Sequence, residues 1–557
     1  MTAEPVTRTP SALDELSDAW LETMLEHEPE WHVELGRPGR EGEYSDLSPD
    51  GHQARADATR AMLARVDAAT PADPVDGVTK LELQRVLGLE IEQHDAGFWR
   101  TDLNVIESPV QNLRAVFDLM PTDTVDDWSG IALRLRNLPA AVDGYLASLQ
   151  AGIDAGDTPA VRQVQEVADQ ASRHADADGF FATLVQRGTA SELPASLVAD
   201  LEAGAVGAAQ SYDELVRFLR EELAPHAREK DAVGPDVYAL ASRGFVGTAV
   251  DLDETYEWGL DELGRMVAEQ ESIAREIVPG GTVDDAVAHL DGDPSRRLHG
   301  TDDLQAWMQR TSDRVVDELG RSHFHIPEPM RRLECLIAPT QEGGIYYTPP
   351  SEDFARSGRM WWSVPEGITE FSPWRELTTV FHEGVPGHHL QCGLAVWNRA
   401  DLNAWRRSAN WNSGHGEGWA LYAERLMADL GYLDDPADRL GMLDGQRMRA
   451  ARVVLDIGVH LEKRLPDGSD RWTGDMAFGF MARHANLNEP LLRFEANRYL
   501  GWPGQAPSYK VGQRLWEQVR DDAHAAAGGA WDVKEFHRRA LALGSVGLGT
   551  LRAALLS

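Results

Sequence analysis

The chain of 557 residues carries 53 Lys and Arg against 91 Asp and Glu, which gives a formal net charge of −38 at pH 7. This charge would repel phosphate backbones and anionic headgroups, so neither nucleic acid nor a membrane surface is expected as a partner. Only two cysteines occur, Cys335 and Cys392, which excludes a disulfide framework and favours a reducing compartment. Because the N-terminal residues also lack the apolar run of a secretory signal, we expect a cytoplasmic protein.

From residue 13 to about residue 320, apolar residues recur at three- and four-residue spacing, which is the period of an amphipathic helix. Proline and glycine clusters interrupt this pattern, for example at 71–74, 234–235 and 279–281. The predicted helices cover residues 54–69, 79–96, 131–155, 160–175, 197–224 and 252–277. We expect residues 1–320 to form a helical N-terminal lobe.

The pattern changes after Ser322, because residues 333–363 are rich in aromatic residues, glycine and proline, with apolar runs too short for helices. We predict two or three short strands, around 333–337, 344–347 and 360–364. Helical patterning returns at Pro373 and continues to the C-terminus. The fold expected is mainly α: a large helical two-lobed cleft fold with one small β-sheet beside the active-site helix. Residues 321–557 form the catalytic lobe, and both lobes belong to one continuous unit.

The residues that carry chemistry are concentrated in the segment 372–391. Ser372 and Pro373 favour a helix start, because serine caps free amides and proline at the first position loses no hydrogen bond. The helix presents His382 and Glu383 side by side. In the H-E-x-x-H arrangement, two histidines one turn apart bind zinc, and the glutamate between them takes a proton from water.

The spacing of the next histidines departs from that arrangement. His388 and His389 lie six and seven positions after His382, and neither position faces His382 at close range in an ideal helix. Pro386 and Gly387 favour a local bulge, since proline removes an amide and glycine tolerates unusual backbone angles. If the bulge loops out two residues, His388 returns to the position one turn beyond His382. We therefore predict His382 and His388 as metal ligands, with His389 as the alternative to His388.

A third ligand is predicted in the segment 412–426, a second helix opened by capping residues. Hydrolytic zinc sites generally use three protein ligands and a water. Glu417 and Glu424 are seven residues apart and share a helix face, so we predict Glu417 as the ligand and Glu424 as the carboxylate that orients a ligating histidine. A pair of glutamates on a solvent-exposed face would explain the same spacing. His415 is a further candidate beside the metal or the substrate.

A later helix carries Arg452, Asp456 and His460 at four-residue spacing, so that one face presents a cation, a carboxylate and an imidazole. These residues are candidates for binding substrate, and His460 is a candidate for stabilising an oxyanion. An ion pair on a helix surface explains the pattern nearly as well.

Two further segments offer groups for substrate binding. Residues 498–510 combine a Pro-Gly turn with donor side chains, and Tyr509, Lys510 or Arg498 could stabilise an oxyanion or bind a peptide carboxylate. Tyr347 lies in a predicted strand, which could align an extended peptide if it forms a sheet edge beside the metal.

Four segments, HEGVPGHHLQ, EGWALYAE, RVVLDIGVH and PGQAPSYKVG, lie between residues 382 and 512 and together resemble the bacterial domain of unknown function 885, which is grouped with gluzincin metallopeptidases. The resemblance implies a helical cleft fold similar to the carboxypeptidase Taq family. It also implies that His382, His388 and Glu417 are the ligands and that Glu383 is the base. This chain departs from the gluzincin pattern by two extra residues in the first motif.

The function expected is that of a zinc-dependent peptidase, a carboxypeptidase or oligopeptidase acting on short peptides. Glu383 would accept the proton of a metal-activated water, and Tyr509 or His460 would stabilise the oxyanion. One Zn²⁺ ion is expected, although Mn²⁺ and Co²⁺ also accept imidazole and carboxylate ligands.

Two alternatives remain: a metal-dependent hydrolase of a non-peptide amide or ester, and a catalytically inactive, metal-stabilised binding protein. Glu383 argues against the second, since a structural site needs no base. The sequence leaves open whether the protein forms a homodimer.

Overall fold

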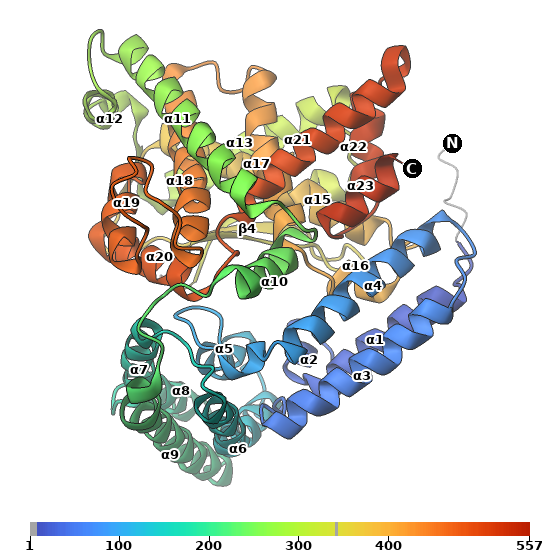
Figure 1. The fold of residues 1–557 in the computed structure, drawn as a ribbon, viewed down its shortest axis with the longest axis vertical. Helices are drawn as coiled ribbons and strands as arrows, with labels where there is room; N and C mark the ends of the chain where they lie inside the picture. Colours follow the sequence, from blue (N-terminus) through green and yellow to red (C-terminus); the bar gives the residue numbers. More distant parts are fainter. Residues whose placement is uncertain (1–7, 340–343, 557) are drawn as a thin grey trace.

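The computed structural model describes residues 8–339 and 344–556 and is mainly α-helical, with a small sheet, as predicted (Figure 1). The first helices, drawn in blue, lie along one lower edge of the molecule, and a bundle in teal lies beside them. The remaining helices form a larger upper body that ends at the C-terminus. The N-terminal helices are α1 (Ala12–His27), α2 (Glu30–Glu34), α3 (Pro49–Ala68), α4 (Pro74–Asp95), η1 (Phe98–Arg100), α5 (Pro109–Leu119), α6 (Val125–Ala155), α7 (Val161–Ala175), α8 (Phe180–Thr189), α9 (Ala195–Arg217), η2 (Phe218–Leu223) and η3 (Ala224–His226).

The upper body contains the remaining helices and all the described strands. Its helices before the metal-binding segment are α10 (Pro235–Val246), α11 (Leu252–Ile277), α12 (Val283–Asp291), η4 (Pro294–Arg296), α13 (Gly300–Ser322) and η5 (Glu328–Arg331). They are followed by α14 (Pro373–Glu383), α15 (His388–Trp397), α16 (Ala404–Ser408), α17 (Ser413–Asp429), α18 (Pro436–His460), η6 (Gly474–Met476), α19 (Ala477–His484), α20 (Glu489–Gly501), α21 (Ser508–Ala527), η7 (Gly528–Ala530), α22 (Val533–Leu541) and α23 (Leu548–Leu556).

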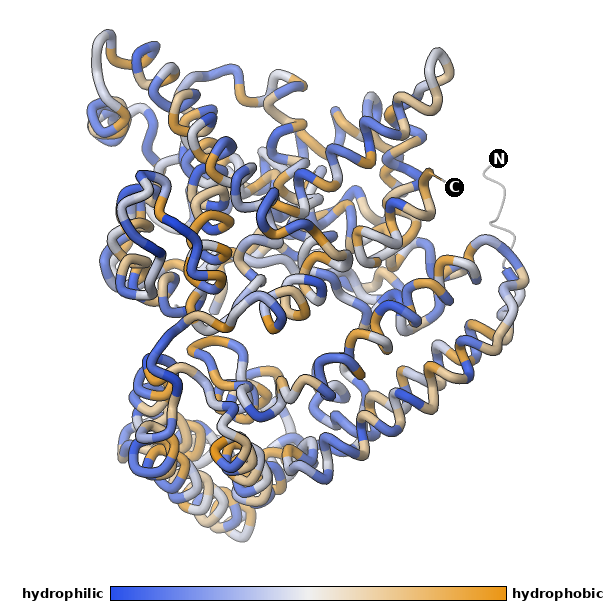
Figure 2. Tube along the Cα trace, in the orientation of Figure 1, coloured by the Kyte–Doolittle hydropathy of each residue, from blue (hydrophilic) through white to orange (hydrophobic). Residues whose placement is uncertain are grey.

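All six helices predicted from the apolar period are present, and capping chemistry explains where they begin. The helix α3 starts ahead of the predicted residue 54, because Ser48 accepts a hydrogen bond from the Gly51 amide at 3.2 Å and proline occupies the first position. The helix α11 has the predicted bounds. The predicted helix 197–224 changes to a π-helical turn, η2, after Arg217. Figure 2 shows hydrophobic and hydrophilic residues alternating along most helices, as expected when one face is buried.

The hydrophobic cores do not divide at residue 320, where the sequence pattern had placed a lobe boundary. One core lies within residues 103–223, whereas the largest core runs from Tyr238 to Leu555. The helices α10, α11 and α13 therefore pack with the catalytic part of the chain. The reason is close helix packing: Gly259 of α11 brings its backbone against Val453 of α18.

The predicted sheet is present, with strands β2 (Leu333–Ile337), β3 (Ile345–Thr348) and β4 (Gly358–Trp362) in the order β2-β4-β3. The strand β4 is parallel to β2 and antiparallel to β3, which places β3 at an edge. A second pair, β1 (Leu298–His299) with β5 (Glu370–Phe371), was not predicted, because two-residue strands carry no periodic signal.

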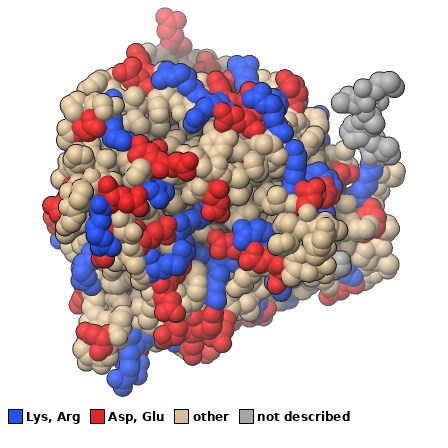
Figure 3. Space-filling view, turned by 90° about the horizontal axis from the view of Figure 1, so that it is seen from above, with Lys and Arg blue, Asp and Glu red and all other residues tan. Residues whose placement is uncertain are grey.

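On the face seen in Figure 3, acidic and basic side chains are interspersed, so the net negative charge does not gather into one patch there. Within residues 8–339 and 344–556, no helix has the length and apolarity needed to cross a bilayer.

Candidate metal centre

The helix α14 supplies His382 and Glu383 from its last turn, and its opposite side is held by the largest hydrophobic core. Trp374, Leu377 and Phe381 are buried in that core. Pro373 occupies the first turn as predicted, but Ser372 makes no side-chain cap bond, so the predicted serine cap is wrong. The rigidity of this support therefore comes from packing rather than from capping.

The segment between the two histidines is a break between helices rather than the predicted bulge within one. The helix α14 ends at Glu383 and α15 begins at His388. The chain turns back on itself, since the Gly387 amide donates to the carbonyl of Phe381 at 3.0 Å and the His389 amide donates to that of Gly384 at 3.1 Å. A Cβ at Gly387 would overlap the His382 carbonyl, so only glycine allows this approach.

This break brings three predicted ligands together. The Nε2 atoms of His382 and His388 lie 3.3 and 3.7 Å from Glu417 Oε2. One ligand atom from each residue lies within 4.8 Å of the other two. The imidazole rings are perpendicular, with centroids 4.9 Å apart. Two imidazole nitrogens and a carboxylate oxygen converging on one point form a donor set that suits zinc.

Glu424 lies behind His382 as the sequence predicted. Its Oε1 accepts a hydrogen bond from His382 Nδ1 at 2.8 Å, which leaves Nε2 directed toward Glu417. Gln446 of α18 donates to the other Glu424 oxygen at 3.0 Å, and Lys510 in turn donates to Gln446 at 2.7 Å. A chain of buried hydrogen bonds thus orients the first imidazole.

The electrostatics of the cluster follow from burial and from these contacts. Burial by itself lowers the pKa of His382, but the hydrogen bonds with Glu417 and Glu424 raise it to about 10. Burial favours the neutral form of Glu417, yet the two histidines hold its pKa well below the usual range. Positive charge on the histidines thus stabilises the ionised Glu417 carboxylate.

Glu383, the predicted base, is buried beside this cluster. Burial raises the pKa of its carboxyl group, and Glu417 adds to that shift, whereas His382 and His388 oppose it. A carboxylate with a raised pKa holds a proton more readily at neutral pH, which suits a general base.

His389, the alternative ligand, is directed away from Glu417. Its Nε2 donates to the Met330 carbonyl at 2.8 Å, and its Nδ1 accepts from Tyr347 at 2.9 Å. Burial lowers its pKa to about 4, so the ring is neutral. His389 instead connects α15 to the edge strand β3, where Tyr347 lies. The strand β3 thus lies at an edge of the sheet, as expected. The Tyr347 hydroxyl, however, is hydrogen-bonded to His389 rather than directed to solvent.

The stripe Arg452, Asp456 and His460 does not reach the metal ligands. Gln446, which contacts Glu424, lies 14 residues before His460 on α18, and that separation corresponds to about 21 Å of helix rise. His460 donates from Nε2 to the Tyr499 carbonyl at 3.0 Å. The expectation that His460 stabilises an oxyanion is therefore wrong.

The other two members of that stripe are also occupied by packing partners. Asp456 accepts hydrogen bonds from Tyr238 at 2.6 Å and from the Gly504 amide at 3.0 Å. Arg452 donates to Tyr499 at 2.7 Å and pairs with Glu495 at 3.0 Å. The face is buried, which also contradicts the surface ion-pair explanation.

Three donors expected to bind substrate have structural partners. Lys510 is buried and pairs with Glu262 at 2.9 Å, while Arg498 pairs with Glu495 at 3.0 Å. His415 is buried against Trp516, and its Nδ1 accepts from Gln391 at 3.1 Å. Lys510 thus supports the site through Gln446, whereas a direct role in substrate binding is not available to these three residues.

Tyr509 lies at the start of α21, close to the cluster. Its helix crosses α17 at Gly512, where the backbone of Gly418 lies in contact. Burial, together with the negative charge of Glu417, raises the pKa of the Tyr509 hydroxyl, which remains protonated and able to donate. The guanidinium of Arg452 lies 5.2 Å from the centre of the Tyr509 ring and holds it in place.

Two residues near the site escaped the sequence reasoning. Arg449 lies between Gln446 and Arg452 on one face of α18, and its charge acts on Glu383, Glu424 and Tyr509. Among the described residues its guanidinium has no ion-pair partner, and its Nε is buried without a hydrogen bond. Residues three positions apart lie on the same side of a helix, so the spacing from Arg452 could have indicated Arg449 as a further residue near the site.

Trp411 is the second such residue, and no spacing pointed to it. The centre of its ring lies 6.2 Å from that of His388, and 54% of the residue's surface is exposed. It covers Gly416 at the start of α17, because a Cβ there would overlap the indole. Trp411 therefore forms an exposed aromatic surface next to the second histidine.

Comparison with known proteins bears on the family and the fold. A family model described as bacterial protein of unknown function (DUF885) matches residues 29–555. A presumed lipoprotein from Colwellia psychrerythraea has a solved structure that is 20% identical, with a TM-score of 0.81, covering 98% of each chain. A presumed lipoprotein of unknown function from Shewanella oneidensis is 16% identical, with a TM-score of 0.77, covering 98% of this chain and 100% of that one. No curated protein matches. At these identities the solved structures establish the fold alone.

Proposed function

Because the chain belongs to the DUF885 family of bacterial proteins, whose function is unknown, its activity has to be inferred from its site, and we propose that it is a zinc-dependent peptidase acting on short peptides. The observation that carries the proposal is the convergence of His382, His388 and Glu417 on one point, with Glu383 beside them. The resemblance of the motifs to gluzincin peptidases supports the same reading.

The donor set fits the proposed ion. Two histidines and one glutamate are the ligands of one class of catalytic zinc site, in which the remaining position is open to water or substrate. A zinc ion bound by these residues would polarise a carbonyl group and lower the pKa of a water molecule. Mn²⁺ and Co²⁺ accept the same donors, so the identity of the ion is part of the proposal.

Glu383 takes the role of proton acceptor and returns the proton to the leaving amine. Its place next to His382 in the chain keeps it beside the ligands, and its raised pKa suits proton transfer near neutral pH. Tyr509 remains protonated and can donate a hydrogen bond to the developing oxyanion.

Arg449 supports cleavage near the carboxyl end of a peptide. It is a cation without an ion-pair partner among the described residues, and its charge acts on groups of the site. A guanidinium binds a carboxylate through two parallel hydrogen bonds, so the free C-terminus of a short peptide is a fitting partner. A carboxypeptidase or an oligopeptidase would use it in this way.

The substitution Glu383→Gln tests the proposal. It removes the base and leaves the three ligands, so we expect the variant to keep its zinc content while peptide hydrolysis falls by about 10²- to 10⁴-fold. Zinc is measured by elemental analysis, and cleavage of a peptide library by mass spectrometry.

The matched control is Glu366→Gln, which changes a glutamate on an exposed loop. This control should behave like the wild type. Undiminished hydrolysis by the Glu383→Gln variant would exclude Glu383 as the base. Hydrolysis of acylated amides or esters without any peptide cleavage would keep the metal chemistry and change the substrate class, and a lack of both activities in zinc-loaded protein would favour a binding protein.

A further inference from the structure

A pocket beside the second histidine of the candidate metal centre lies between the N-terminal helices and the upper body. It has a volume of about 280 Å³, and its walls come from α1, α2, α3, α4, α10 and the segment that joins α16 to α17. Its large apolar side chains are those of Met24, Trp31, Val86, Leu89, Trp405 and Trp411. We call it the Trp411 pocket, because Trp411 connects it to the metal centre: the centre of its ring is 6.2 Å from that of His388.

The backbone around Trp411 is held on both sides, although more than half of the residue is exposed. Before it, Asn410 is buried and donates to the Ser545 carbonyl at 2.8 Å. After it, Asn412 is buried, and its side chain donates to the Gly244 carbonyl at 3.0 Å. The backbone amide of Asn412 donates to Ser545 Oγ at 3.1 Å. A large aromatic side chain that a rigidly held loop presents to solvent is typical of residues that contact ligands.

The indole ring is held as firmly as the backbone. A Cβ at Gly416 would lie 2.3 Å from its Cη2 atom, so the ring packs directly against the first turn of α17. Gly416 directly precedes the proposed ligand Glu417. The ring of Trp411 therefore has a fixed place between the proposed ligands and the pocket that it lines.

The charged residues in the wall of the Trp411 pocket have partners within the protein. Arg55 pairs with Glu28, and its guanidinium also lies 4.0 Å from Glu90. Arg85 pairs with Glu82 of the same helix. Because each charge is matched, the wall does not favour a charged occupant, and its apolar surface decides what binds.

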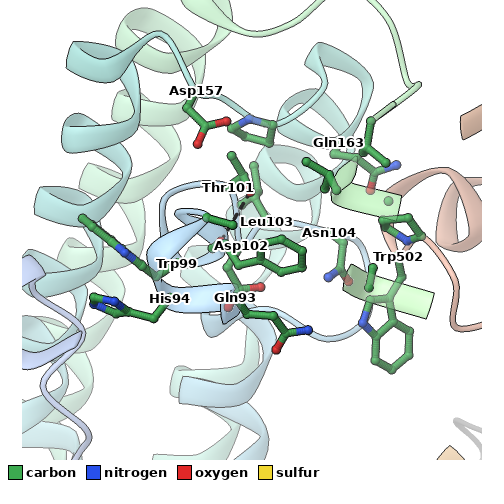
Figure 4. Close-up of a pocket in the computed structure, with 18 of the residues that line it drawn as sticks. Gln93, His94, Trp99, Thr101, Asp102, Leu103, Asn104, Asp157, Gln163 and Trp502 are labelled. Atoms are coloured by element: carbon green, nitrogen blue, oxygen red, sulfur yellow. Dashed lines mark hydrogen bonds between the residues drawn. The ribbon is translucent and has the colours of Figure 1, made fainter. Parts of the chain in front are cut away.

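The size of the Trp411 pocket suits one large side chain. Its volume of about 280 Å³ lies just below the roughly 300–1,000 Å³ of sites that enclose a whole small ligand. A larger cavity of about 430 Å³ adjoins it, since Arg55, Glu90 and Gln93 line both. Figure 4 shows this second cavity, with Gln93 and Trp502 among the residues of its wall. A peptide with one side chain in the Trp411 pocket therefore has space for neighbouring residues.

We propose that the Trp411 pocket is a specificity subsite that receives a large apolar or aromatic side chain of a peptide, next to the bond that is cleaved. The choice of a peptide as occupant rests on the proposed peptidase function, and the subsite specifies which peptides are preferred. Trp411 packs against the bound side chain, and removal of that side chain from water supplies the selectivity. The closeness of Trp411 to His388 brings the bound residue beside the proposed metal ion.

The experiment measures binding separately from hydrolysis. The pentapeptides Gly-Gly-Phe-Gly-Gly and Gly-Gly-Ala-Gly-Gly are titrated by calorimetry into the full-length protein, which a chelator keeps free of metal. We expect the phenylalanine peptide to bind at least about tenfold more tightly, because it alone has a large apolar side chain to bury. Equal affinity for the two peptides, or no binding of either, would overturn the proposal.

Two substitutions assign the preference to the Trp411 pocket. Trp411→Ala should reduce it to less than about threefold, and this variant should unfold close to the wild-type temperature because the residue is largely exposed. Ala409→Leu adds bulk to the wall and keeps the indole, so it should weaken binding of the phenylalanine peptide alone. The matched control Trp397→Ala removes an indole that is 40% exposed outside this pocket and should keep the full preference. A preference that survives Trp411→Ala would contradict the assignment.

Zinc-loaded protein distinguishes a failure of the subsite from a failure of the proposed peptidase function. If the phenylalanine peptide binds more tightly but no peptide of a library is hydrolysed, the subsite is supported and the peptidase proposal fails. If library peptides are hydrolysed while kcat/KM does not depend on apolar side chains and both pentapeptides bind equally, the subsite fails and the peptidase proposal remains.

Discussion

At the scale of single residues, the candidate metal centre depends on one imidazole being held by a carboxylate. The bond between His382 Nδ1 and Glu424 fixes the ring orientation in which Nε2 faces Glu417. Glu424 is itself held by Gln446, so the orientation of the ring is set by residues of two further helices. Sites of this kind lose affinity when the supporting carboxylate is replaced.

We therefore expect Glu424→Gln to lower zinc affinity by about 10- to 100-fold, because a neutral amide supports the imidazole less well than a carboxylate. Competition with a chromophoric chelator measures the dissociation constant. Glu489→Gln, at an exposed helix start, serves as the control and should bind zinc as the wild type does. Equal affinity in all three proteins would show that Glu424 has no part in metal binding.

A second residue-scale prediction concerns Asp456, which is buried and hydrogen-bonded away from the site. Burial raises its pKa from 3.8 to about 7, and the bonds from Tyr238 and Gly504 reduce that rise only in part. Since the folded-state pKa exceeds the unfolded one, the contribution of the protonated acid to stability is complete below about pH 4 and is lost as the pH rises through 7.

The variant Asp456→Asn keeps an oxygen that can accept both bonds but does not titrate. Between about pH 4 and pH 8, the free energy of unfolding of the wild type should fall relative to the variant by up to about 4 kcal/mol. Denaturant unfolding of both proteins across this range measures the difference. A difference that does not change with pH would mean that Asp456 has a normal pKa.

At the scale of elements, the site depends on close contacts between helices that only glycine permits. The helices α17 and α21 cross where Gly418 meets Gly512, and a Cβ at Gly418 would overlap the Gly512 backbone. This crossing positions Tyr509 beside Glu417. The break between α14 and α15 likewise requires a glycine, because a Cβ at Gly387 would overlap the His382 carbonyl. Small residues at crossings let backbones approach, and any larger side chain must push the helices apart.

Gly418→Ala should therefore lower the free energy of unfolding by about 1–3 kcal/mol and reduce any hydrolytic activity, because α21 and Tyr509 are displaced. The matched control is Gly264→Ala in α11, where an added Cβ meets nothing within 4 Å. That change should raise stability by up to about 1 kcal/mol through its higher helix propensity. Equal effects of the two substitutions would contradict close packing at the crossing. Thermal and denaturant unfolding provide the comparison.

At the scale of the whole molecule, the separate hydrophobic cores imply that a metal ion bound at the proposed site would stabilise one part of the chain more than the other. The proposed ligands belong to the body whose core runs from Tyr238 to Leu555, whereas the bundle of α6–α9 has its own core. A ligand that binds only the folded state stabilises it in proportion to the logarithm of its concentration.

Zinc at about a thousandfold excess over its dissociation constant should raise the free energy of unfolding of the metal-free protein by about 4 kcal/mol. Hydrogen exchange should show added protection in α14, α15 and α17, with little change in α6–α9. His388→Ala removes one ligand and should abolish the effect, and magnesium should not replace zinc. Equal stabilisation of the variant would place the bound metal elsewhere.

The periodicity of apolar residues was sufficient to predict the local elements, although the predicted Ser372 cap is absent. The six predicted helices and three predicted strands are present, since an amphipathic period or a short apolar run bounded by turns is encoded in neighbouring residues. The motif spacing also predicted His382, Glu383, Glu417 and Glu424 as neighbours in one site, and the structure brings these four residues together. These residues could be found because each pair lies within one helix or one short segment.

The tertiary structure decided what depends on residues distant in the chain. It brought His388 rather than His389 to Glu417, because a complete helix break at Gly387 directs one imidazole to α17 and the other to Met330 and Tyr347. It also buried Arg452, Asp456 and His460 among packing partners, whereas Arg449 has no ion-pair partner among the described residues. A helical face can be read from the period of a sequence, but the groups that this face meets are set by packing against other elements.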